Sequence, residues 1–252
     1  MSLNQITTIF FDVDGIFTDG SLYFLENGVK MSKFNVYDGM GCILLKEVGI
    51  ELLILTARHS DAIIERFKDL IGIQFVLTKE WNKLPHTKGW RYGMGKALAV
   101  LKPGKLTQIW KILEICVESD LIVIMQAANT GLTGGSTPFG SDYDRPIVII
   151  NTMRIKDIHI IKEGSQIVGL TGSTLYGLER KLKPYGREPH SIIGSTSIGA
   201  SIIGGICNNA GGSLVQRGPS YTEMALYARI SKTGNLELVN DLGINLGSNP
   251  EE

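Results

Sequence analysis

The chain has 252 residues, of which 43% are hydrophobic and 20% charged, the composition of an ordinary globular protein. Basic and acidic residues are equal in number, which excludes a sequence-independent nucleic-acid binder because such a protein needs a basic excess. The three cysteines form no Cys-x-x-Cys pair, so they argue against a thiolate zinc site and predict reduced thiols in a cytoplasmic protein.

The first third of the chain alternates predicted strands with predicted helices. Apolar runs predict strands at residues 8–13, 51–56 and 73–78. Helices are expected at residues 39–48, before Gly49, and after a cap at Ser60, where the apolar face is Ile63, Ile64, Phe67 and Leu70. A hairpin is expected around Glu26-Asn27-Gly28. This alternation predicts an α/β region with a parallel sheet and right-handed crossovers.

Two aspartates follow the first predicted strand. Asp12 and Asp14 lie in the segment FFDVDGIFTDG, at the end of a strand where an open parallel sheet binds its ligands. One carboxylate can attack phosphorus while the other transfers a proton, and both can bind Mg²⁺. The pattern predicts a phosphoryl-transfer site, and the alternative reading is a solvated acidic turn.

Residues 9 to about 84 resemble the haloacid-dehalogenase superfamily of phosphatases. The resemblance rests on FFDVDG and on three later segments, residues 33–41, 56–58 and 82–84. It is closest to the enzymes that dephosphorylate 3-deoxy-D-manno-octulosonate 8-phosphate, a sugar-acid phosphate. It implies Asp12 as nucleophile, Asp14 as acid and base, Thr56 as a phosphoryl-oxygen ligand, Lys83 as the neutralising cation, and Mg²⁺ held by Asp12 and Asp14. The acidic motif that completes the Mg²⁺ site in this family does not follow Lys83, so we expect a poor or inactive phosphatase.

The remainder of the chain has a different pattern. Residues 79–96 show no clean period, and a domain boundary is predicted there, between residues 1–84 and 85–252. Further strands are expected at residues 97–100, 121–126, 147–151, 158–161 and 167–170, with a closing hairpin from 227–230 and 236–239. Helices are expected on a face formed by Leu106, Ile109, Trp110, Leu113 and Val117, at 174–185 before Gly186, and within 197–213.

A glycine-rich polar loop follows the strand predicted at residues 121–126. Its small residues expose successive backbone N–H groups, and such a concave nest suits a pyrophosphate. A second segment, residues 193–212, interleaves glycine with apolar residues, as backbone does when it packs against a planar ring or a dinucleotide. The alternatives are a mobile surface loop for the first segment and close helix–sheet packing for the second.

Residues 88–252 resemble the FAD-binding domain of the respiratory, quinone-dependent D-lactate dehydrogenase family, an α+β fold of the vanillyl-alcohol oxidase type. The resemblance includes the loop at 127–138, residues 186–191 and the segment 206–224. It implies FAD contacts at Ala127, Ala128, Asn129, Thr130, Gly131, Gly135, Ser136, Gly194, Ser201 and Gly211. It also implies a small 2-hydroxy acid, D-lactate, as substrate and a membrane quinone as electron acceptor, with the full-length family on the inner face of the cytoplasmic membrane.

Both resemblances are expected to be partial. The phosphatase-like part lacks the last acidic motif of its family. For the dehydrogenase-like part, the family's substrate and membrane-binding region is expected beyond residue 252. A fused gene, a shifted or misassembled reading frame, and an engineered chimera remain open explanations. The predicted function is an FAD-binding oxidoreductase fragment, with a Mg²⁺-dependent sugar-acid phosphatase and a non-catalytic chimeric fragment as alternatives.

Overall fold

The computed structural model describes residues 6–12, 16–18, 23–24, 30–31, 33–55, 58–243 and 245, with 24, 30–31, 54–55 and 58–60 as backbone only. It has two compact units, Met1–Ala62 and Ile63–Glu252. The boundary predicted between residues 84 and 85 concerns where one family resemblance replaces another, and it remains a prediction.

The first unit contains the predicted parallel strand pair. Strand β1 (Thr8–Asp12) pairs in parallel with β4 (Glu51–Leu55), and helix α1 (Val36–Glu47) connects them in sequence. The predicted hairpin is confirmed by the antiparallel strands β2 (Tyr23–Phe24) and β3 (Lys30–Met31), although its turn lies outside the described residues.

Helix α1 begins three residues before the predicted start. The Asn35 side chain accepts a hydrogen bond from the backbone N–H of Tyr37 at 3.0 Å, which caps the helix ahead of Gly39. The predicted end is confirmed to within one residue, since the chain turns at Gly49 with φ +82°.

The second unit is built on a four-stranded sheet in the order β5-β6-β8-β7. Strands β6 (Ala99–Leu101), β8 (Ile147–Asn151) and β7 (Ile122–Gln126) are parallel, and β5 (Val76–Leu77) lies antiparallel at one edge. The prediction that residues 73–78 add a third parallel strand to the first sheet is wrong. Residues Ile73–Phe75 form a 3₁₀ turn, and the short strand after it pairs with β6.

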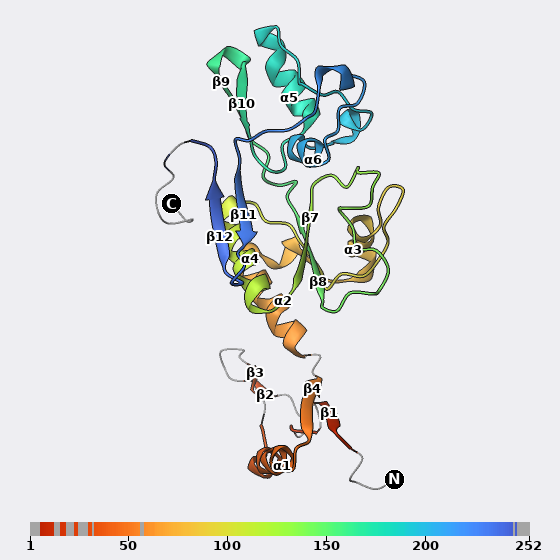
Figure 1. The fold of residues 1–252 in the computed structure, drawn as a ribbon, viewed down its shortest axis with the longest axis vertical. Helices are drawn as coiled ribbons and strands as arrows, with labels where there is room; N and C mark the ends of the chain where they lie inside the picture. Colours follow the sequence, from red (N-terminus) through yellow and green to blue (C-terminus); the bar gives the residue numbers. More distant parts are fainter. Residues whose placement is uncertain are drawn as a thin grey trace. The chain divides into compact units, whose positions relative to one another are not determined.

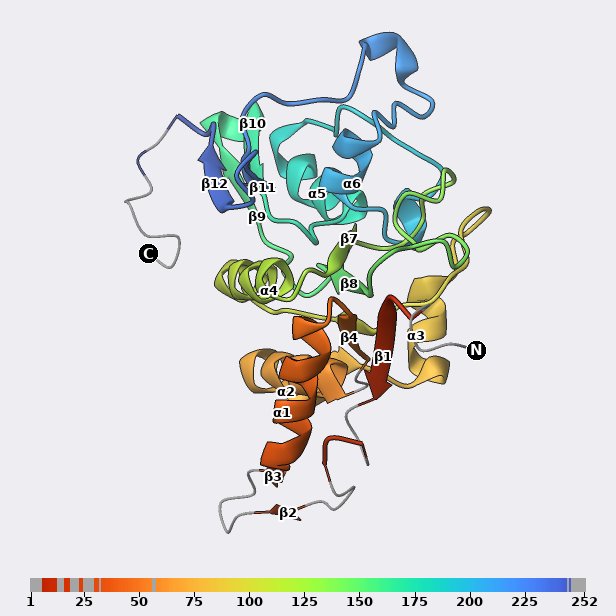
Figure 2. The same ribbon diagram turned by 60° about the horizontal axis from the view of Figure 1, so that its bottom comes forward.

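Both faces of strands β6 and β8 are buried, as in parallel sheets covered by helices, whereas strand β7 is partly exposed. On one face, Val148 and Ile150 of β8 pack in a core with helices α2 (Arg58–Ile71) and α4 (Leu106–Glu118). On the other face, Ile149 packs in a small cluster with Val100 of β6 and with Ala97, which precedes that strand. Figures 1 and 2 show α4 and α3 (Glu80–Thr87) on opposite sides of strands β7 and β8.

Three helix predictions need correction. Helix α2 begins at Arg58, so Ser60 lies inside it and is not its cap, although the expected face is buried through Phe67. Helix α4 turns a different face inward, formed by Ile109, Ile112, Ile115 and Cys116. Helix α3 occupies the region predicted to be irregular, because its buried residues are the polar Lys83 and Thr87 and give no apolar period.

A smaller layer follows the sheet in sequence. Strands β9 (Ile158–Ile161) and β10 (Gln166–Gly169) form an antiparallel pair that packs with helices α5 (Leu175–Leu182) and α6 (Ile202–Cys207). The predicted stop is confirmed, since the chain turns at Gly186 with φ 63°.

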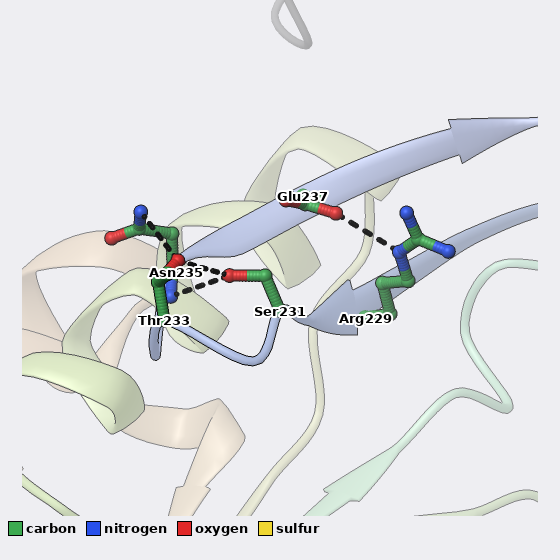
Figure 3. A network of polar contacts seen from close by, with 5 residues as sticks. All are labelled: Arg229, Ser231, Thr233, Asn235 and Glu237. Atoms are coloured by element: carbon green, nitrogen blue, oxygen red, sulfur yellow. Dashed lines mark hydrogen bonds and ion pairs between the residues drawn. The ribbon is translucent and has the colours of Figure 1, made fainter.

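The described chain closes with a hairpin of β11 (Leu226–Ile230) and β12 (Leu236–Asn240), as predicted. Arg229 pairs with Glu237 across the strands at 2.9 Å. Figure 3 shows this pair and the hydrogen bonds by which Ser231, Thr233 and Asn235 fix the turn. Within the described residues, no helix combines the length and the apolar character that crossing a bilayer requires.

Candidate functional site

The predicted pyrophosphate loop leaves the carboxyl end of β7. Asn129 is in the left-handed region at φ 54°, and Gly134 has φ +80°, so the backbone curls instead of continuing the strand. Among the described residues, no backbone N–H from 127 to 136 donates to a protein acceptor. Residues 127–130 are only partly buried, and residues 131–133 are exposed. The loop therefore presents a run of free donors at the end of a parallel strand, which can bind an anion.

The second glycine segment lies against this loop. A Cβ atom placed on Gly199 would be 3.9 Å from the Cβ of Ala128. Two backbone hydrogen bonds hold the segment in place, from Leu175 N–H to the Ala200 carbonyl at 2.9 Å and from Ile202 N–H to the Ser173 carbonyl at 2.8 Å. The fold therefore brings together two segments that are about seventy residues apart in sequence, as one extended ligand requires.

Three of the glycines that were predicted to contact FAD border open space. A Cβ atom on Gly131, Gly135 or Gly194 would meet no atom of the protein within 4 Å. In contrast, a Cβ atom on Gly93 would lie 2.1 Å from the Thr137 hydroxyl, so that glycine is required by packing. The first three glycines border open space, where a ligand's backbone contacts can be made without obstruction.

Several predicted FAD contacts have side chains that are engaged within the protein. The Asn129 amide donates to the carbonyls of Pro85 and Lys88, and the Ser136 hydroxyl donates to the Asn129 side-chain oxygen at 2.9 Å. The Ser201 hydroxyl is buried and accepts from Gly204 N–H, which caps α6. At these positions a ligand would be bound mainly by backbone groups, and the individual FAD contacts remain predictions.

A buried polar cluster beneath the loop was not predicted from the sequence. The side chain of Gln126, at the end of β7 and only 2% exposed, bonds to His86, Asn151 and the Ser136 carbonyl. Burial lowers the pKa of His86 below its ordinary value, although the bond to Gln126 opposes that shift. A glutamine that ends an otherwise apolar strand was the available signal.

The predicted phosphatase residues are divided between the two units. Asp12 is exposed at the carboxyl end of β1, paired in register with Leu55 of β4, whereas Asp14 and Thr56 lie outside the described residues. Lys83 is 4% exposed in the second unit, where its ammonium group donates to the Ala97 carbonyl at 2.5 Å and pairs with Glu80 at 2.8 Å. Within the described part of the chain, no group of three or more His, Cys, Asp or Glu residues is placed to bind a metal ion.

Comparisons with known proteins separate the two parts of the chain. The sequence pattern of the FAD binding domain family matches residues 97–234. The chain is similar to a quinone-dependent D-lactate dehydrogenase from Haemophilus influenzae, 60% identical over 190 residues that cover 75% of this chain and 34% of the relative. It thus spans about a third of the length of that relative.

The phosphatase resemblance also has a counterpart. A 3-deoxy-D-manno-octulosonate 8-phosphate phosphatase from Haemophilus influenzae is 37% identical over 81 residues, which cover 32% of this chain and 44% of the relative. The matches of 190 and 81 residues cannot fit into 252 residues without sharing some.

Solved structures give a similarity of fold alone. A structure of alkyldihydroxyacetonephosphate synthase, 14% identical, covers 73% of this chain and 36% of its own chain with a TM-score of 0.61.

Proposed function

The chain belongs to the FAD-binding domain family, with the vanillyl-alcohol-oxidase-type fold that its sequence predicts, and from this premise we propose that residues 127–136 and 194–211 hold FAD in a D-lactate-oxidising protein. The observation that carries the proposal is the run of free backbone donors from 127 to 136 beside open glycines. Phosphate oxygens accept hydrogen bonds from such donors without needing a charged side chain.

The protein's contribution is to bind and orient the cofactor. When bound, FAD would supply a hydride acceptor for carbon 2 of D-lactate, and loss of the hydroxyl proton to solvent or to a base together with that hydride would give pyruvate. In the proposed site the loop holds the pyrophosphate through backbone N–H groups, and the segment around Gly194 and Gly199 lies against it. A quinone is the proposed electron acceptor. Because quinones lie in membranes, the proposed protein would act at the cytoplasmic face of a membrane.

Titration of the purified chain with FAD tests this function. We expect saturable quenching of flavin fluorescence and a yellow protein that absorbs near about 450 nm after gel filtration. The control is Gly41→Ala in α1 of the first unit, where a Cβ atom meets nothing within 4 Å, and this variant should bind FAD as the unmodified chain does. Colourless protein that takes up no added FAD contradicts the proposal.

A Mg²⁺-dependent sugar-acid phosphatase is the second candidate. It is favoured by the exposed Asp12 at the end of a parallel strand, together with the 37% identity to a phosphatase. Phosphate release from a sugar-acid phosphate that requires Mg²⁺ and disappears in Asp12→Asn is the expected result. Absence of Mg²⁺-dependent release rejects this activity, and failure of both assays leaves a non-catalytic chimeric chain.

A further inference from the structure

Helix α3 ends against the pyrophosphate loop. The last carbonyls of a helix have no partner within it and need one from outside. Here the carbonyls of Leu84, Pro85, His86 and Thr87 accept, in that order, from Lys88 N–H, the Asn129 side chain, the Gln126 side chain and Gly95 N–H. Two of the four partners therefore belong to the end of β7 and to the loop that follows it.

The Gln126 side chain ties the two ends of the loop together. Its amide nitrogen donates to the His86 carbonyl at 2.9 Å and to the Ser136 carbonyl at 2.7 Å. Its oxygen faces the Nδ1 atom of His86 at 2.7 Å and the side-chain nitrogen of Asn151 at 3.2 Å. All the bonds that a buried amide can readily make are thus present, and they fix the distance between residues 126 and 136.

This network assigns a tautomer to His86. The two carbonyl partners of the Gln126 nitrogen fix which way its amide points, because carbonyls only accept. The Gln126 oxygen must then accept a hydrogen bond from a protonated Nδ1 of His86. His86 is therefore a donor to the side chain that joins residues 126 and 136.

We propose that His86 is a positioning residue that keeps the pyrophosphate loop in its binding shape through Gln126, and the consequence for FAD rests on the function proposed above. Loss of the Nδ1 donor leaves the buried Gln126 oxygen with one partner, Asn151 at 3.2 Å. The poorly satisfied oxygen favours rotation of the Gln126 amide, and this rotation breaks the bond from the amide nitrogen to the Ser136 carbonyl. Helix α3, which begins in the segment with the phosphatase resemblance and ends beyond it, thus serves the proposed flavin site.

The test compares two variants that remove the donor with one that keeps it. His86→Leu has no donor, and His86→Phe has none but keeps a flat ring in case the leucine variant does not fold. His86→Asn places an amide N–H near the position of Nδ1 and should rescue. The matched control is His159→Leu, at an exposed histidine of β9 in the same unit.

Two readouts are taken on each full-length protein. Backbone ¹⁵N relaxation of the ligand-free chain reports the order of residues 127–136, with order parameters of about 0.85 for rigid and below about 0.6 for mobile backbone. Flavin fluorescence with FAD reports affinity. In His86→Leu and His86→Phe we expect the loop amides to become mobile and the Kd to rise about tenfold, which corresponds to one neutral hydrogen bond. His86→Asn and His159→Leu should match the unmodified chain.

The outcomes separate this inference from the proposed function. A loop that stays equally ordered in His86→Leu and His86→Phe overturns the positioning role, as does an asparagine variant that fails as they do. If the unmodified chain binds no FAD while loop order still follows the expected pattern, the positioning role stands and the proposed function fails.

Discussion

The two units differ in how far their apolar residues are buried. In α1 of the first unit no side chain is buried, and Val36 and Tyr37 are each 84% exposed. In the second unit all five residues of β8 are buried, and Phe67 of α2 is completely so. A matched sequence motif can therefore lie in a unit whose described side chains include no buried hydrophobic residue. Since burial of apolar area dominates stability, we expect the second unit to carry most of it.

Phe67→Ala is expected to show the largest difference in stability between the two units. Removal of a fully buried ring leaves a cavity in the core that α2 and α4 share with the sheet, and such changes cost about 3–5 kcal/mol. We expect that loss in the free energy of unfolding of the second unit, measured by urea denaturation. Tyr37→Ala in α1 is the control and should change stability by less than about 0.5 kcal/mol. Equal losses in the two variants would show that the units do not differ as described.

Gly135→Val separates binding from stability within the second unit. A Cβ atom at this position meets no protein atom within 4 Å, so unfolding should be nearly unchanged. In the FAD-bound state the added side chain would obstruct the pyrophosphate, and we expect the Kd for FAD to rise about 100-fold, or about 2.7 kcal/mol. Gly194→Ala should give a smaller loss of affinity. Unchanged FAD affinity in Gly135→Val would place the ligand elsewhere.

Gly41→Ala tests whether α1 of the first unit is a stable helix. Gly41 lies within α1, and a Cβ atom there meets nothing within 4 Å. Alanine in a helix is more stable than glycine by about 0.5–1 kcal/mol, so this change should stabilise the first unit. Amide hydrogen exchange of α1 measures the gain. Faster exchange in the variant would mean that α1 is not the helix described here.

The smallest expected effect is a pH dependence that belongs to the second unit. Because burial lowers the pKa of His86 in the folded state, folding favours the neutral ring. The neutral His86 ring contributes its whole share of the free energy of unfolding above the ordinary histidine pKa of about 6.5. This share is lost as the pH falls below that value toward the pKa of His86 in the folded protein. Thermal unfolding between pH 7.5 and 5 should show this loss, and His86→Asn should reduce it. An identical pH profile in the two proteins would remove His86 as the cause.

The sequence predicted those elements whose signals are local. Strands β8 and β9 were predicted with their observed bounds because each is a short apolar run between turns. The end of α5 and its 3₁₀ extension was marked by Gly186, and the final hairpin by its two alternating runs. The glycine-rich loop was predicted as the site because its composition is itself the feature that exposes backbone donors.

What the sequence did not predict depends on long-range contacts. Helix α3 contains Pro85 and buries Lys83, whose charge is balanced by Glu80 and the Ala97 carbonyl, so no apolar period reveals it. Strand β5 was assigned to the wrong sheet, because its own residues do not specify which strand it pairs with, and the fold pairs it antiparallel with β6. The bond between Gln126 and His86 joins residues 40 positions apart.

The most direct test of the central claim is an amide NMR titration of the full chain with FAD. We expect the largest changes in amide chemical shift at residues 127–136 and 194–201, since those backbone groups would bind and border the cofactor. We also expect that the described residues of the first unit remain unshifted. FAD that binds with shifts confined to other residues, or that causes no shifts, would contradict the central claim.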